Sequence, residues 1–185
     1  MVKKPDFSFD YDQGLLLRKR EPGVCYGMCR RILEEFGTKV SWNDYTAAEL
    51  LKKIETLVKG KNFLDRARDA QHRRRQSGRT TVRTLTENII YIVGLNITEG
   101  KGYLTRYSLW SYVYIPFCKT ASWNSNHAAM LVGIGGNILI FEPNWGGAVW
   151  QGQAIDRLTW RQLEEYLEYG YSSANKPIYV AEVET

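Results

Sequence analysis

The feature that most constrains the fold of this chain is a pair of apolar runs, residues 126–134 and 137–141, separated by Gly135-Gly136. Two glycines, with Asn137 directly after them, accept the positive φ angles of a tight turn. The pattern therefore predicts a β-hairpin, and this part of the chain is expected to form an antiparallel sheet.

Three further segments have the composition of strands. Residues 109–117 are rich in aromatic and β-branched side chains, as strands are. Residues 145–151 follow a turn at Pro143-Asn144 and predict a third strand after the hairpin. Residues 178–183 predict a closing strand. The second half of the chain is therefore expected to be dominated by the sheet.

Helical periodicity dominates the first half of the chain. Apolar residues recur at helical spacing over residues 25–36 and 47–58. Residues 62–75 predict a third, highly charged helix, and residues 80–93 are interpreted as a fourth, although their composition is partly β-branched. A further helix over residues 159–169 has Thr159 as its expected cap.

The remaining segments complete the prediction of the fold. Residues 1–22 are interpreted as an irregular arm, and residues 41–44 as a connection with a helix cap. With helices first and strands after them, the expected fold class is α+β, with N-terminal helices packed on an antiparallel β-sheet. We expect a single domain over residues 1–185.

Composition limits the class of protein. The chain has 185 residues, of which 44% are hydrophobic, and no run of about 18 apolar residues that could span a membrane. Three cysteines argue against a disulfide scaffold. The N-terminus has lysines but no apolar core of a signal peptide. We therefore expect a protein that is secreted without a cleavable signal peptide, for delivery into target cells, or is otherwise cytoplasmic.

A basic tract covers residues 66–83, where seven arginines fall within eighteen residues of a chain whose net charge is +5. A solvated helix end is the ordinary interpretation of such a tract. The alternative is contact with an acidic partner or a membrane surface through residues Arg66 to Arg83. His72 is the only ring in the tract, and this disfavours nucleic acid as a partner, because single-strand binding depends on interleaved aromatic rings.

Cys25 is the candidate nucleophile. Pro22 and Gly23 form turns, and Met28, Ile32 and their neighbours then recur at helical spacing, so a helix begins at or beside Cys25. A thiol at a helix N-terminus faces unpaired N–H groups and the positive end of the helix dipole, which favour the thiolate. Together with a histidine, such positions lower the pKa of a cysteine from about 8.5 into the range of roughly 3.5–7.5.

The chain contains two histidines, and this narrows the choice of base. His72 lies inside the arginine tract, where neighbouring cations depress its basicity. His127 begins the first strand of the predicted hairpin, where a ring can stand at the mouth of a cleft. A buried histidine bonded to a backbone carbonyl is the alternative, but the presence of Cys25 favours His127 as the general base.

The third member of the site is predicted from the hairpin. The turn returns Glu142 and Asn144 to the neighbourhood of His127. Either side chain could accept a hydrogen bond from the imidazole and fix its orientation. Glu142 adds a charge that would stabilise an imidazolium–thiolate pair, and Asn144 remains the alternative.

Three short segments of the chain resemble the YopT/AvrPphB family of papain-like cysteine proteases. They are Gly23 to Met28, Asn126 to Ala129 and Phe141 to Gly146. The family consists of effectors that bacteria deliver into other cells. The resemblance implies a papain-like fold, with Cys25, His127 and Glu142 in the places of nucleophile, base and acidic partner. The family has aspartate where this chain has Glu142, which is one methylene longer. The substrate of the family is not carried over.

Two further residues complete the predicted chemistry. Gln13 is the candidate side-chain donor of an oxyanion hole, together with the backbone N–H of Cys25. Cys29 lies one turn along the helix from Cys25 and is expected to pack in the core. A zinc site of Cys25, Cys29 and His127 is disfavoured, because two cysteines four residues apart on a helix, with few other ligands in the chain, do not make up a usual zinc ligand set. No metal and no organic cofactor are expected.

The leading hypothesis is therefore a cysteine hydrolase that attacks amide bonds in a protein or peptide substrate. A glutamine deamidase, a transglutaminase and a peptidoglycan amidase use the same residue types and remain alternatives. A hypothesis of another class is a non-catalytic binding module in which the cysteine is merely buried.

Overall fold

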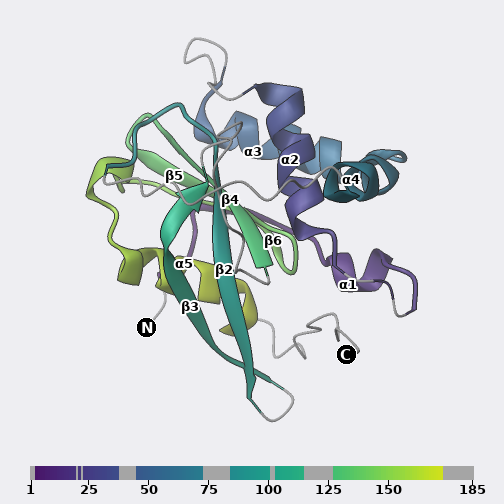
Figure 1. Cartoon of the computed structure of the whole chain (residues 1–185). Coiled ribbons are helices and arrows are strands. Elements are labelled where there is room, and N and C mark those ends of the chain that lie inside the picture. Colours follow the sequence, from purple (N-terminus) through teal and green to yellow (C-terminus); the bar gives the residue numbers. More distant parts are fainter. Residues whose placement is uncertain are drawn as a thin grey trace.

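The computed structural model describes residues 3–19, 21, 23–37, 45–72, 84–100, 103–114 and 127–172. In this part of the chain, helices pack on an antiparallel sheet of six strands, which is a mixed α+β fold (Figure 1). No helix among these residues is long and apolar enough to cross a membrane.

The sheet has the order β1-β6-β5-β4-β2-β3, and every neighbouring pair is antiparallel. The strands are β1 (Phe7–Asp10), β2 (Tyr91–Gly100), β3 (Tyr103–Tyr114), β4 (His127–Ile134), β5 (Asn137–Glu142) and β6 (Gly146–Trp150). The hairpin predicted around the two glycines is confirmed as β4 and β5. Gly135 and Gly136 have φ angles of 59° and 76°, a conformation that glycine adopts without strain.

Five α-helices accompany the sheet in the described residues. They are α1 (Gln13–Leu16), α2 (Cys25–Phe36), α3 (Ala47–Val58), α4 (Phe63–His72) and α5 (Trp160–Ser172), and a short 3-10 helix, η1 (Ile155–Arg157), precedes α5. The helices predicted over residues 25–36, 47–58 and 159–169 are confirmed, as is the described part of the helix predicted over residues 62–75, and α2 and α3 have the predicted bounds. The predicted cap of α5 is also present, since the Thr159 hydroxyl accepts from the Gln162 backbone N–H at 3.2 Å.

Alternate residues of β4 face two different cores. Ala128, Met130 and Val132 pack in the core beneath α2 and α3, whereas Ala129 and Leu131 pack in the core beneath α5. Figure 1 shows α2, α3 and α4 over one face of the sheet and α5 over the other. Because both faces of β4 are covered, its sequence is a continuous apolar run rather than an alternating one.

The helix predicted over residues 80–93 is wrong for the described part of that segment. Residues 84–90 form turns and an isolated bridge, and β2 begins at Tyr91. Asn88 has a φ angle of 71°, which ends any helix there, and its N–H donates to the Gly133 carbonyl at 2.8 Å. The β-branched residues of this segment are better buried beside β4 than in a helix, so tertiary packing decides its conformation.

The irregular arm predicted over residues 1–22 is also corrected. It contains β1, which pairs with β6 at the edge of the sheet, and the short helix α1. The Tyr11 and Gln13 N–H groups donate to the Trp145 and Pro143 carbonyls at 3.0 and 2.9 Å. These long-range bonds fix the arm beside the end of β5. The predictions for residues 41–44, 115–117 and 178–183 lie outside the described residues.

Candidate active site

Cys25 is the first residue of α2, as the turn before it predicts. Its side chain is largely buried, with 8% of the residue exposed. The N-cap residue, Val24, makes no side-chain hydrogen bond to the first N–H groups of the helix. The sulfur therefore lies where the backbone offers donors and a positive partial charge.

His127 and Glu142 lie side by side at the open end of the β4–β5 hairpin. Met130 pairs with Phe141, and this register brings the start of β4 to the end of β5. The Nε2 atom of His127 is hydrogen-bonded to Glu142 Oε1, and both residues are buried. Since Nε2 is occupied, Nδ1 is the nitrogen left to hydrogen-bond the Cys25 sulfur.

The surroundings of Cys25 favour its thiolate. Burial acts to raise the pKa of the thiol, but the charge and hydrogen bond of His127 and a hydrogen bond from the Ala128 backbone outweigh it. The pKa of Cys25 is therefore lowered from its ordinary value. A buried thiol with a lowered pKa requires a specific cation beside it, and here that cation is the imidazolium.

The surroundings of His127 favour the imidazolium in turn. Burial alone would lower the pKa of His127, but the charges of Glu142 and Cys25 and the hydrogen bonds to them raise it to about 10. The pKa of Cys25 is lowered and that of His127 is raised, which are the directions expected of a thiolate–imidazolium pair. Such a pair is the activated state of a cysteine nucleophile.

The two candidates for orienting the imidazole have separate partners. Glu142 contacts His127 with its carboxylate, and the same oxygen accepts from the Asn144 backbone N–H at 3.1 Å. The Asn144 side chain instead accepts from Gln13 Nε2 at 2.7 Å. Of the two, Glu142 is therefore the side chain that the structure places against the imidazole Nε2.

Gln13 lies beside the nucleophile although it is twelve residues away in sequence. Its Oε1 atom accepts from the Val24 backbone N–H at 3.1 Å, directly before Cys25. Only 5% of Gln13 is exposed. The short helix α1, which periodicity does not predict, begins at this residue and holds it in place.

A residue that the sequence did not indicate holds the first turn of α2. Gln71 of α4 accepts from the Gly27 N–H with its side-chain oxygen, at 2.8 Å. Gly27 lies against the backbone of Ala67 in the same helix. Gln71 stands in a charged helix with no motif around it, so no local signal could have identified this contact.

No group of three or more His, Cys, Asp or Glu side chains suited to a metal ion occurs in the residues that the structure describes. Cys29 is fully buried in the core, as predicted, and burial raises the pKa of its thiol well above the ordinary value. Cys118 lies outside the described residues. The two described thiols therefore differ in that the pKa of Cys25 is lowered and that of Cys29 is raised.

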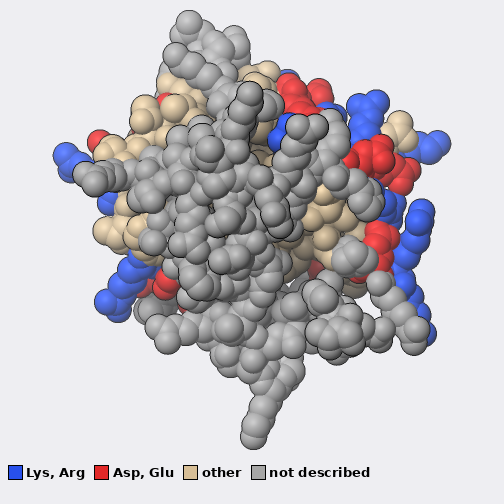
Figure 2. Space-filling model, viewed as in Figure 1, with Lys and Arg blue, Asp and Glu red and all other residues tan. Residues whose placement is uncertain are grey.

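In the described part of the basic tract, Arg68 is paired with acidic groups. Arg68 makes two hydrogen bonds to Glu21, at 2.6 and 3.2 Å, and one to Asp65 at 2.7 Å. Figure 2 shows basic and acidic side chains next to one another along the side where α2 and α4 lie. Arg66 is the other described arginine of the tract, and the rest lie outside the described residues.

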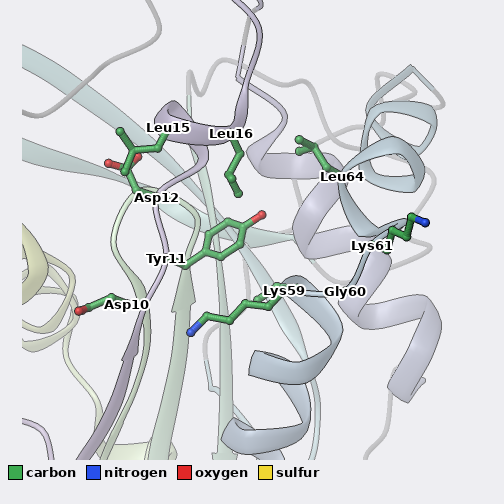
Figure 3. Close-up of a pocket in the computed structure, with 10 residues that line it drawn as sticks. Asp10, Tyr11, Asp12, Leu15, Leu16, Lys59, Gly60, Lys61 and Leu64 are labelled. Atoms are coloured by element: carbon green, nitrogen blue, oxygen red, sulfur yellow. The ribbon is translucent and has the colours of Figure 1, made fainter.

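A separate cavity of about 450 Å³ lies between the arm and the connection from α3 to α4 (Figure 3). Tyr11 stands among its walls, with Leu16 and Leu64 near the hydroxyl. The hydroxyl is buried and has no hydrogen-bond partner among the described residues. Burial raises the pKa of Tyr11 to about 12. Cys25 is not among the residues that line this cavity.

The unpaired hydroxyl has a measurable consequence. Since it is buried without a partner, the Tyr11→Phe change is expected to raise the free energy of unfolding, by up to about 1 kcal/mol. Tyr91→Phe is the matched control, because the Tyr91 hydroxyl accepts from the Thr86 N–H at 2.8 Å. That change should cost about 1 kcal/mol in urea denaturation. Equal losses in both variants would show that the Tyr11 hydroxyl has a partner.

Comparison of the chain with protein-family models, with curated proteins and with solved structures finds no match.

Proposed function

We propose that this protein is a cysteine hydrolase with a papain-like fold that cleaves amide bonds in a protein or peptide substrate. The observation that carries the proposal is the contact of a thiol at a helix start with a buried histidine whose second nitrogen is bonded to a carboxylate. This arrangement activates a nucleophile, because the base His127 is adjacent to the Cys25 thiol and is itself oriented by the Glu142 carboxylate.

The proposed reaction uses three side chains of this chain. The Cys25 thiolate adds to the substrate carbonyl, and His127 gives its proton to the leaving amine as the C–N bond breaks. A thioester remains on the sulfur. His127, now neutral, takes a proton from water, which adds to the thioester and releases the acid. Glu142 holds the imidazole in place throughout.

Stabilisation of the intermediate is assigned to two donors near the sulfur. The Cys25 N–H stands at the start of α2, where no intrahelical acceptor exists for it. The Nε2 atom of Gln13 has two hydrogens, of which Asn144 takes one. The second is available to a negative oxygen formed beside Cys25.

The wider role follows from the resemblance to the YopT/AvrPphB family. We propose an effector or toxin that acts on a protein of a target cell. The tract from Arg66 to Arg83 would contact an acidic partner or membrane surface there. The test of this role is to produce the wild type and Cys25→Ala in parallel in three places. These are a bacterial periplasm, a bacterial cytosol and a eukaryotic cell. Changes in the eukaryotic proteome that require Cys25 support it, whereas lysis confined to the periplasm favours a wall amidase.

The pH dependence of thiol alkylation tests the activated cysteine directly. Because the pKa of Cys25 is lowered and that of His127 is raised to about 10, the ion pair exists between the two values. Iodoacetamide should therefore label Cys25 rapidly near pH 6, with a further change only as His127 loses its proton near pH 10. Cys29 should stay unlabelled in the folded protein. Equally slow labelling of both thiols, measured by peptide mass spectrometry, would contradict the proposal.

A further inference from the structure

The side chain of Gln13 is held at both ends of its amide. Its oxygen accepts from the Val24 N–H at 3.1 Å, and its nitrogen donates to Asn144 Oδ1 at 2.7 Å. The amide packs beside Gly23, since a Cβ on Gly23 would meet its atoms at an ordinary van der Waals distance, 3.5 Å. The plane of the amide is therefore fixed relative to the residue before Cys25.

Asn144 has two distinct roles that a substitution can separate. Its backbone N–H donates to Glu142 Oε1, and every residue except proline would keep that bond. Its side chain serves Gln13 instead. Removing the side chain should therefore disturb Gln13 and leave the link from Glu142 to His127 intact.

These contacts close a ring of residues around the nucleophile. From Val24 the bonds pass through Gln13, Asn144 and Glu142 to the imidazole, which contacts the sulfur of the next residue, Cys25. Part of this ring orients the base, and part of it orients the donor for the oxyanion. Asn144 is the residue at which the two parts meet.

We infer that Asn144 is a positioning residue that holds the Gln13 amide for stabilisation of the oxyanion, rather than an orienting partner of His127. This inference rests on the proposed function, since it gives Asn144 a role in that reaction. Its physical basis is pre-organisation: one N–H of Gln13 is tied to Asn144, so the other has a defined direction before substrate binds.

Two thiol reagents separate this role from activation of the thiol. Acetylation by p-nitrophenyl acetate adds the Cys25 thiolate to a carbonyl, forms an oxyanion, and then expels p-nitrophenolate to leave a thioester. Alkylation by iodoacetamide displaces iodide from a tetrahedral carbon and forms no oxyanion. The ratio of the two rates at Cys25 therefore reports on the oxyanion donors and is independent of the amount of thiolate.

Asn144→Ala should lower the acetylation rate about tenfold and change the alkylation rate less than about twofold, because the donor is retained but loosened. Gln13→Ala should lower acetylation by about 100-fold or more, since it removes the donor. Asn144→Asp keeps an oxygen that accepts from Gln13 and should restore most of the rate. The double variant Gln13→Ala/Asn144→Ala should be no slower than Gln13→Ala alone, because Asn144 acts through Gln13.

Asn137→Ala is the matched control, since its side chain accepts from the Gly152 N–H at the far end of the hairpin. It should leave both rates unchanged. An unchanged ratio in Asn144→Ala, or additive losses in the double variant, would overturn the inference while leaving the activated cysteine intact. Equal losses in both reactions would assign Asn144 to His127 instead. If neither reagent selects Cys25 in the wild type, the proposed function fails, and this inference fails with it.

Discussion

In a His127→Ala variant, alkylation of Cys25 near pH 6 is expected to fall by about 100-fold or more, because a thiol without its paired cation is almost wholly protonated there. His127 supplies both a charge and a hydrogen bond that lower the pKa of Cys25. Without this charge and this hydrogen bond, burial becomes the main influence on the thiol, and burial raises the pKa of Cys25. The bond from the Ala128 backbone remains, but it is the weaker contribution. The rate is measured by iodoacetamide labelling and peptide mass spectrometry.

The other histidine of the chain provides the control for this experiment. His72 belongs to α4, and the same change to alanine there should leave the rate at Cys25 unaltered. The dependence on pH gives a second check. The rate in His127→Ala should rise steadily into the alkaline range, as for an ordinary buried thiol, instead of reaching a plateau near neutrality. Equal rates at pH 6 in wild type and His127→Ala would remove the thiolate–imidazolium pair from the mechanism.

Local sequence signals predicted the elements that bear the candidate catalytic side chains. The turn at Gly135 and Gly136 fixes the register of the hairpin, and the register brings Glu142 to His127. The start of α2 follows from the turn before Cys25 and the apolar spacing after it. These features are predictable because each depends on residues that are close together in the chain.

The parts that the sequence did not predict depend on distant contacts. The spacing of residues 80–93 predicts a helix only ambiguously, and the pairing of Tyr91 to Val93 with β4 makes the end of this segment the start of β2. The segment that contains β1 and α1 has too few residues for a periodic signal. The bond from Gln13 to Asn144 joins residues 131 positions apart. No local pattern carries information about a contact between residues so far apart in the sequence.

The close contact of α2 with α4 gives the largest expected effect on stability. A Cβ atom at Gly27 would lie 1.9 Å from the Ala67 carbonyl oxygen and 2.9 Å from the Gln71 nitrogen, and both are backbone atoms. Backbone cannot move aside as a flexible side chain can, so the two helices would have to separate. Gly27→Ala is therefore expected to lower the free energy of unfolding by about 3 kcal/mol or more. The direction of the change distinguishes the two effects. Helix propensity alone would make Gly27→Ala stabilising by about 1 kcal/mol, whereas the backbone clash makes it destabilising.

Gly23→Ala is the control for this prediction, because the nearest atoms that the added Cβ would meet belong to the Gln13 side chain, at an ordinary contact distance of 3.5 Å. Its free energy of unfolding should stay within about 0.5 kcal/mol of the wild type. Urea denaturation measures both variants. Gly27→Ala should also slow alkylation of Cys25, since the Gln71 bond to the first turn of α2 would be lost with the contact. A Gly27→Ala protein as stable as the wild type would show that α2 and α4 are not packed through this glycine, and that something else holds the helix start where Cys25 meets His127.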